Sequence, residues 1–230
     1  MTDSDSLRIL ILGRGRMGRE VRAAAEARGH EVVGMWGRDD LAEGDWPEAD
    51  VAVDFTVPDA AVDVYAACRR QSLPLVSGTT GWLSHWDEVE REVVRSNHAM
   101  LWASNFSQGV FLFRKALRKV HEEMREQGYG LRVEEVHHTG KVDAPSGTAL
   151  SLADDLRQGG AQEVPVHAER IPGVPGTHAV VWENEVDRIS LEHAAKNRSG
   201  FAQGAVQCAE WLVRQTPPFD KIHSIEEVWG

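Results

Sequence analysis

Cysteine is scarce in this chain of 230 residues, which contains only Cys68 and Cys208. Two cysteines cannot form a disulfide framework, and these two lack the spacing of zinc ligands, so we expect a reducing compartment. Basic residues are also in deficit, with 25 lysines and arginines against 36 acidic residues and a net charge of -11. This charge disfavours nonspecific binding to nucleic acid or to an anionic membrane.

Long apolar runs are missing as well. The start, MTDSDSLRILILG, has no basic segment and only a short apolar run before the glycine. A signal peptide needs both a basic start and a longer apolar segment, and a membrane span needs more still, so we predict a cytoplasmic protein. The hydrophobic share of 42% and the length suffice for one large domain or two modest ones.

Strand-like and helical patterns alternate over the first 103 residues. Five segments have the length and composition of strands, at residues 7–12, 31–36, 50–55, 73–76 and 99–103. The first, LRILIL, is continuously apolar apart from one arginine, as expected for a parallel strand buried on both faces. We therefore predict an α/β fold that begins with a doubly wound, Rossmann-like dinucleotide-binding domain over residues 1–103.

A glycine-rich turn follows the first predicted strand and leads into a helical pattern. It consists of Gly13, Arg14, Gly15, Arg16, Met17 and Gly18. Between a strand and a helix, a GxGxxG turn is typical of dinucleotide binding. Gly13 and Gly15 would let the backbone approach the pyrophosphate, Gly18 would allow close packing, and the helix start would face the phosphates. An ordinary glycine turn is the alternative.

Two further positions in this half bear on the cofactor. After the second strand of such folds, an acid favours the free 2′-hydroxyl of the ribose, whereas arginine favours a 2′-phosphate. Arg38 and Asp39 point to opposite choices. We favour Arg38 and NADPH, with NADH use and a solvated surface charge left open. The GTTG turn at residues 78–81 follows a strand and should lie at the carboxyl edge of the sheet, where ligands bind.

The pattern changes after residue 103. An amphipathic helical pattern covers about 110–127, and strand-like segments cover residues 164–171, 178–183 and 187–194. Because helices and strands no longer alternate, we predict an α+β substrate domain with a mixed sheet over residues 104–199. A closing helix over about 200–214, with the tail to residue 230, is expected to pack back on the first domain.

The stretch HHTGKVDAPSGTA, residues 137–149, concentrates the most chemistry. A strand-like pattern precedes it and a helical one follows, so Ser146 is expected to cap a helix. The first backbone N–H groups of that helix, at Gly147 and Thr148, would favour a small carboxylate.

Two adjacent imidazoles and a lysine stand just before this helix start. Of His137 and His138, one could exchange a proton near neutral pH while the other donates a hydrogen bond, and Lys141 adds a positive charge. The stretch predicts a pocket for a small acid with a proton donor beside it. The alternative is a loop in which the histidines only satisfy backbone groups. A metal site is not expected, because adjacent histidines cannot readily ligate one tetrahedral ion and no HExxH motif is present.

Seven segments, taken in order, resemble the 4-hydroxy-tetrahydrodipicolinate reductase family, also called dihydrodipicolinate reductases, of the diaminopimelate route to lysine. They are GRMG at 15–18, DFTVP at 54–58, GTTG at 78–81, SNFSQGV at 104–110, EVHHTGKVDAPSGTA at 135–149, RIPGVPGTH at 170–178 and FAQGAVQCAEWL at 201–212. The resemblance covers nearly the whole chain, and the long central motif is its most specific part. It departs from many members in a shorter glycine turn and in Arg38, where an acid is common.

The resemblance implies reduction of a small dicarboxylate, 4-hydroxy-tetrahydrodipicolinate, by NADPH or NADH, with hydride transferred to ring C4. It implies that His137 is the proton donor and Lys141 the second catalytic residue. The implied substrate-binding positions are His138, Lys141, Ser146, Gly147 and Thr148. The implied cofactor-binding positions are residues 13–18, Gly78, Thr79, Thr80, Ala103, Ser104, Asn105 and Phe106. A homotetramer built through the sheet of the substrate domain is also implied.

Two other functions compete with this one. A dinucleotide sensor without turnover would be expected to have lost the proton donor or the lysine, yet His137 and Lys141 are both present. A two-domain dehydrogenase for another amino-acid precursor is disfavoured by the motif at residues 137–149.

Overall fold

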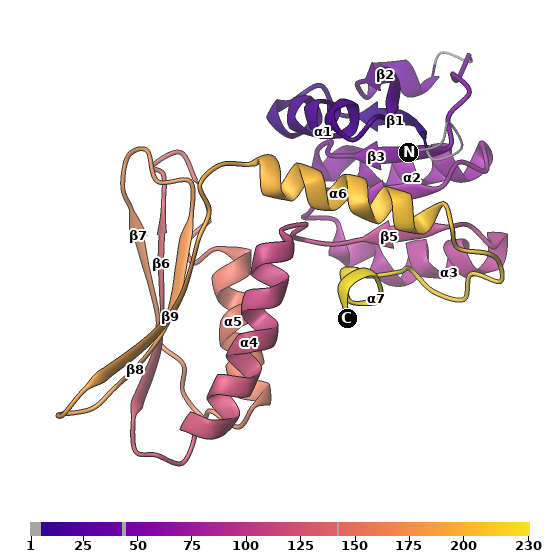
Figure 1. Ribbon diagram of the computed structural model, residues 1–230. Coiled ribbons are helices and arrows are strands. Elements are labelled where there is room, and N and C mark those ends of the chain that lie inside the picture. Colours follow the sequence, from indigo (N-terminus) through magenta and orange to yellow (C-terminus); the bar gives the residue numbers. More distant parts are fainter. Residues whose placement is uncertain (1–5, 43–44, 142) are drawn as a thin grey trace. The chain divides into compact units, whose positions relative to one another are not determined.

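The computed structural model describes residues 6–42, 45–141 and 143–230 and is shown in Figure 1. The chain divides into two compact units. The first is Met1–Ser107 together with Ser199–Gly230, and the second is Gln108–Arg198. The change from the first unit to the second therefore comes where helix α4 (Gln108–Met124) begins, four residues after the boundary expected from the sequence.

A parallel five-stranded sheet forms the centre of the first unit. Its strands are β1 (Arg8–Leu12), β2 (Glu31–Trp36), β3 (Val51–Asp54), β4 (Leu75–Ser77) and β5 (Met100–Trp102). They lie in the order β2-β1-β3-β4-β5, with every pair parallel. The predicted Rossmann-like α/β fold is confirmed. The order changes direction between β1 and β3, and open α/β sheets bind ligands beyond the carboxyl ends of the strands at such a switch point.

Helices cover this sheet because each has one apolar face. They are α1 (Arg16–Ala27), α2 (Pro58–Arg70), α3 (Trp86–Ser96), α6 (Ser199–Leu212) and the short α7 (Ile225–Trp229). Helix α6 packs against α1 and contacts β3, β4 and β5, while α2 packs against α3. The carboxyl-terminal segment is therefore part of the first unit (Figure 1).

Short 3-10 turns lie between some of these elements. Residues Leu83–His85 form such a turn, directly before α3 begins at Trp86. A second 3-10 turn, Asp39–Ala42, follows β2. Helix α3 ends at Asn97, which adopts the left-handed conformation with φ 51°, a conformation that asparagine tolerates better than most residues.

The second unit is a four-stranded mixed sheet with two helices on one face. Its strands are β6 (Gly130–His137), β7 (Val166–Arg170), β8 (Thr177–Glu183) and β9 (Arg188–Ala194), in the order β7-β6-β8-β9. Strands β6 and β7 are parallel and the other neighbours are antiparallel, so the predicted mixed sheet is confirmed. Helices α4 and α5 (Gly147–Gln158) lie on the same side of this sheet (Figure 1). They bury Leu117, Leu152 and Leu156 with Val180 and Trp182 of β8.

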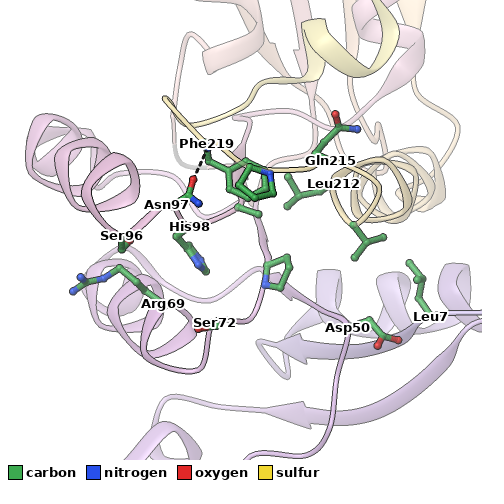
Figure 2. Close-up of a pocket in the computed structure, with 14 residues that line it drawn as sticks. Leu7, Asp50, Arg69, Ser72, Ser96, Asn97, His98, Leu212, Gln215 and Phe219 are labelled. Atoms are coloured by element: carbon green, nitrogen blue, oxygen red, sulfur yellow. Dashed lines mark hydrogen bonds between the residues drawn. The ribbon is translucent and has the colours of Figure 1, made fainter.

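A pocket of about 530 Å³ opens at the amino ends of the first unit's strands (Figure 2). Its lining includes the residue before each of four strands, namely Leu7, Asp50, Pro74 and Ala99. The carboxyl-terminal tail closes it, with the backbone N–H of Phe219 donating to Oδ1 of Asn97 at 2.7 Å. Because ligands of open α/β sheets bind at the opposite edge, this pocket is not the expected cofactor site. In the described parts of the chain, no helix is long and apolar enough to cross a membrane.

Candidate functional site

The glycine turn after β1 is shaped by contacts within the chain. A Cβ atom on Gly13 would lie 2.4 Å from the carbonyl oxygen of Phe55, and one on Gly18 would lie 1.9 Å from the carbonyl oxygen of Gly13. Gly13 also has φ +115°, which favours glycine. These two glycines therefore allow β1, the end of β3 and α1 to meet. Gly15 is different, because nothing lies within 4 Å of its Cβ position.

The start of α1 is suited to an anion. Gly15 is its N-cap, no side chain of a described residue caps its first turn, and that turn contains no acid. Its backbone N–H groups, at Arg16, Met17 and Gly18, belong to the four that have no partner within a helix. Together with the helix dipole they form a phosphate site of the kind that dinucleotide-binding folds use. The turn thus fits a pyrophosphate.

The charged residues after β2 form two separate ion pairs. The guanidinium of Arg38 lies 3.3 Å from Oδ2 of Asp63, and both side chains are more than half exposed. The acid tied to the end of β2 is Asp40, which accepts a hydrogen bond from the N–H of Gly37 at 2.5 Å and pairs with Arg14 at 2.7 Å. Sequence reasoning did not select Asp40.

Phe55 brings the three predicted cofactor segments together. Besides its contact with Gly13, its ring would lie 2.2 Å from a Cβ atom on Gly78, and the ring of Phe106 packs edge-on at a centroid distance of 5.9 Å. The turns after β1, β4 and β5 therefore converge on one residue that follows β3, the first at its backbone carbonyl and the other two at its ring. Phe55 lies in the DFTVP segment but was not selected as a site residue, because these contacts join segments far apart in the chain.

Hydrogen bonds fix the backbone of the turn at Gly78, Thr79 and Thr80. The carbonyl oxygen of Thr79 accepts hydrogen bonds from the indole N–H groups of Trp82 at 2.9 Å and Trp102 at 2.8 Å. Its backbone N–H donates to Oγ of Ser77 at 3.3 Å. A fixed backbone of this kind can bind a ligand without first losing conformational freedom.

A buried carboxylate supports the same turn. Asp54 is fully buried and accepts a hydrogen bond from the Ser77 hydroxyl at 2.7 Å and one from the N–H of Thr56 at 2.9 Å. Burial raises the pKa of Asp54, although these hydrogen bonds act in the opposite direction. Asp54 was likewise not selected from the sequence, although it ends a buried strand, where a charged residue needs partners.

The third cofactor segment follows β5. The N–H of Ala103 donates to the carbonyl oxygen of Ser77 at 3.2 Å, and Oδ1 of Asn105 accepts from the N–H of Ser107 at 2.8 Å. Ala103 and Phe106 are buried, whereas Ser104 is exposed. The segment is therefore anchored at both ends, with one side chain facing solvent between them.

The predicted carboxylate site lies at the start of α5 in the second unit. Ser146 is its N-cap, as expected, with Oγ accepting from the N–H of Ala149 at 3.2 Å. The next residue, Gly147, is exposed, and Thr148 is half-buried. The helix start is thus formed by the residues that the sequence indicated.

A carboxylate of the chain itself occupies this corner. Oδ1 of Asp143 lies 2.8 Å from Nζ of Lys141. Burial alone would raise the pKa of Asp143, but Lys141 and the backbone N–H of Gly147 hold it below its ordinary value. Lys141 and the start of α5 therefore stabilise a negative charge together.

The two adjacent histidines face different environments. His137 ends β6 and is buried, with Nδ1 3.3 Å from Oε2 of Glu135. His138 is half-buried, with Nε2 3.4 Å from the Arg198 guanidinium. Burial lowers the pKa of His137, as does the charge of Lys141, against the opposing effect of Glu135. At neutral pH His137 is therefore mainly uncharged.

Glu135, Arg170 and His178 were not selected from the sequence, yet they surround His137. Nη2 of Arg170 donates a hydrogen bond to Oε1 of Glu135 at 3.1 Å. The ring of His178 packs edge-on against the ring of His137, with the ring centroids 4.9 Å apart. Donor atoms of Glu135, His137 and His178 lie within 4.8 Å of one another, a spacing that could hold a metal ion. Arg170 already supplies a positive charge to this carboxylate. The sequence offered one signal for Glu135. Residues two apart on a strand share a face, so a strand that ends at His137 places Glu135 on the same face.

Comparison with known families decides between the competing interpretations. The family model described as dihydrodipicolinate reductase, N-terminus, matches residues 7–106, and the one described as dihydrodipicolinate reductase, C-terminus, matches residues 109–228. The chain belongs to the dihydrodipicolinate reductase family. It is an NAD(P)H-dependent oxidoreductase whose first unit is the dinucleotide-binding domain, and its cofactor is a nicotinamide dinucleotide.

Individual relatives agree with this assignment to the dihydrodipicolinate reductases. A 4-hydroxy-tetrahydrodipicolinate reductase of Christiangramia forsetii is 38% identical over 228 residues, covering 93% of this chain and 95% of the relative. One of Bdellovibrio bacteriovorus is 34% identical over 226 residues, covering 95% and 96%. Both relatives therefore match the chain through both units.

Solved structures agree in fold. A dipicolinate-bound dihydrodipicolinate reductase from Paenisporosarcina sp. TG-14 aligns with a TM-score of 0.73 at 20% identity, covering 96% of this chain and 99% of that one. A probable dehydrogenase from Thermotoga maritima aligns with a TM-score of 0.62 at 10% identity, covering 97% and 92%. At these identities the likeness concerns the fold alone, which dihydrodipicolinate reductases share with other dehydrogenases.

Proposed function

We propose that this chain reduces 4-hydroxy-tetrahydrodipicolinate to tetrahydrodipicolinate with NADPH or NADH, in the diaminopimelate route to L-lysine. Its family and the reductases that it matches support this reaction. The observation that carries the proposal is the carboxylate corner, where Lys141 and the start of α5 already stabilise the Asp143 carboxylate. A dicarboxylate substrate offers the same group to the same partners.

The roles of the second unit's residues follow from their chemistry. His138, Lys141, Ser146, Gly147 and Thr148 bind the substrate, the last three through its carboxylate at the helix start. His137 donates a proton, and Lys141 assists protonation or loss of the hydroxyl group. The net reaction takes up one hydride at ring C4 and one proton, and releases the hydroxyl group as water.

The first unit holds the cofactor in this proposal. The reduced nicotinamide supplies the hydride when the dinucleotide is bound. The turn at residues 13–18 binds the pyrophosphate, and the segments at 78–80 and 103–106 complete the site. Arg38 is exposed and paired only with an exposed Asp63 in the described structure, so it is available for a 2′-phosphate. We therefore propose that NADPH is preferred and that NADH is also used.

Further properties belong to the same proposal. The small dicarboxylate is the expected partner, with no nucleic acid, membrane or metal involved. The homotetramer built through the β6–β9 sheet and the cytoplasmic location remain predictions.

A coupled assay tests the reaction. A synthase generates the substrate from pyruvate and aspartate semialdehyde, and oxidation of NADPH or NADH is followed by near-ultraviolet absorbance. We expect oxidation that depends on both the synthase and this protein. Binding of dinucleotide without oxidation of either cofactor would contradict the proposal and favour a sensor.

A further inference from the structure

A fully buried carboxylate lies behind the proposed proton donor. Burial alternates along the end of β6, so Val133, Glu135 and His137 share the face that packs toward α5. Glu135 is 1% exposed, and its side chain is not exposed at all. A buried carboxylate is costly unless it is paired, so its partners indicate what it does.

The two oxygens of Glu135 have different partners. Oε1 accepts from the N–H of Ser146 at 3.0 Å and from Arg170 at 3.1 Å. Oε2 lies 3.3 Å from Nδ1 of His137 and 3.7 Å from Nε2 of His178. Oε1 therefore binds the backbone of the N-cap residue and the Arg170 guanidinium, while Oε2 faces the imidazoles of His137 and His178.

The other ring nitrogen of His137, Nε2, faces the backbone of Gly176. A Cβ atom on Gly176 would lie 2.9 Å from Nε2 of His137, and Gly176 has φ +154°, where glycine is favoured. Any larger residue would crowd Nε2. A carboxylate oxygen thus lies beside Nδ1, although the two atoms form no hydrogen bond in the described structure, and Nε2 has room on the side of Gly176.

We propose that Glu135 is the positioning residue of the proton donor, accepting a hydrogen bond from Nδ1–H of His137 so that Nε2 transfers the proton. This inference rests on the proposed function and deepens it. A carboxylate that orients a catalytic imidazole and stabilises its charged form is a recurring arrangement in enzymes. Because Glu135 also holds the N–H of Ser146, it connects the proton donor to the carboxylate site.

The charges around the pair are compatible with this role. Burial alone would raise the pKa of Glu135, but Ser146 and Arg170 hold it below its ordinary value, so Glu135 is ionised at neutral pH. Lys141 and Arg170 lower the pKa of His137, whereas Glu135 and Asp143 raise it.

The neighbouring imidazole is uncharged at neutral pH. His178 has a pKa of about 4, lowered by burial and by His137, and to a lesser extent by His193 on β9 and by Lys141. Its ring packs edge-on against the ring of His137.

The alternative is a structural carboxylate that only holds Ser146 and Arg170. The variant Glu135→Gln separates the two roles, because glutamine keeps an oxygen for the N–H of Ser146 and removes the charge. The matched control is Glu134→Gln, since Glu134 lies on the opposite face of β6 and pairs with Arg132 and Arg188.

We expect Glu135→Gln to lower kcat about 10- to 100-fold, part of the ~10²–10⁴ that a positioned acid contributes. The limb of the kcat–pH profile that reports deprotonation of His137 should move to lower pH, because the charge that favours the imidazolium is gone. The KM for substrate should change little, and Glu134→Gln should leave both the profile and kcat unchanged. A fall in kcat with an unmoved pH profile would overturn the proposal.

A measurement on the unaltered protein keeps the test decisive if the variant does not fold. NMR of ¹⁵N-labelled histidine identifies the neutral tautomer of His137, and we expect the proton on Nδ1. A proton on Nε2 would overturn the proposal. This measurement needs no turnover and so is independent of the coupled assay. If the protein is inactive in that assay but shows the Nδ1–H tautomer, the proposed function is refuted and the pairing of Glu135 with His137 is not.

Discussion

His137 and His138 are neighbours in the sequence and share almost none of their contacts. His137 is buried beside Glu135, and His138 points toward Arg198 from the end of the strand. Successive side chains of a strand point to opposite faces, which explains the separation. The residues alone left open which imidazole exchanges a proton, and the family resemblance implied His137. In the described structure Oε2 of Glu135 lies 3.3 Å from Nδ1 of His137, and our proposal for Glu135 rests on this proximity.

Loss of the His137 imidazole should remove the proton donor while preserving the fold of the first unit. We expect His137→Ala to lower kcat by roughly 10²- to 10⁴-fold, the range for loss of a general acid. Dinucleotide affinity should be retained, because every proposed cofactor residue lies in the other unit. His167→Ala, an exposed position on β7, is the control. An equal loss of cofactor affinity in His137→Ala would show a structural role instead.

Arg38 is the residue on which cofactor preference depends in our account. Arg38→Asp should move the NADPH to NADH ratio of kcat/KM toward NADH, because an acid repels the 2′-phosphate and can bind the free 2′-hydroxyl. Arg91→Asp makes the same change of charge on α3 and should leave the ratio unchanged. If the ratio is equally unaffected in Arg38→Asp, Arg38 does not reach the phosphate, and Arg14 beside Asp40 becomes the next residue to test.

At the scale of elements, the turn between β1 and α1 separates packing from binding. Gly18→Ala would place Cβ 1.9 Å from the Gly13 carbonyl, so we expect a lower melting temperature. Gly15→Ala meets nothing within 4 Å, so it should cost no more than about 1 kcal/mol, from the poorer N-cap, while dinucleotide affinity falls. Thermal unfolding and a dinucleotide titration measure the two effects. Equal melting temperatures for both variants would contradict the packing role of Gly18.

Patterns local in the sequence predicted most elements. The strand expected at residues 31–36 is β2 as observed, the mixed sheet of the second unit is confirmed, and Ser146 caps α5. Periodicity and capping are properties of neighbouring residues, so a sequence displays them directly. The short helix α7 was not predicted, because its five residues are too few to show a helical period.

The residues that support the sites were missed for a different reason. Phe55 contacts Gly13, Gly78 and Phe106, and Glu135 contacts Ser146 and Arg170, all through tertiary contacts. Such contacts depend on strand order and register, which a single sequence does not display. The predicted site residues were those with recognisable motifs, and the residues that position them were not.

At the scale of the whole molecule, each unit contains a buried histidine that makes stability depend on pH. His98 in the first unit and His178 in the second each have a pKa of about 4, lowered chiefly by burial. In the unfolded chain both have a pKa of about 6.5. As the pH falls below ~6.5 the unfolded state binds these protons first, so the free energy of unfolding decreases, and it recovers above that pH.

Urea unfolding measures this dependence. We expect the urea concentration at the midpoint to decrease as the pH is lowered from 7 to 5. This range lies above the ordinary pKa of carboxyl groups, about 4. The decrease should be on the order of a few kcal/mol for the two histidines together. It should be smaller in His98→Asn, whereas His167→Asn, at an exposed position, should match the unaltered protein. A midpoint that stays constant or rises toward pH 5 would contradict the burial of uncharged imidazoles.

The most direct test of the central claim follows the hydride itself. The synthase-coupled reaction is run with NADPH deuterated at the transferring position of C4 of the nicotinamide, and the product is examined by mass spectrometry and NMR. We predict one deuterium per product molecule, at ring C4 of tetrahydrodipicolinate. A product without deuterium, or a bound dinucleotide that is never oxidised, would contradict the account of this chain as a reductase of this substrate.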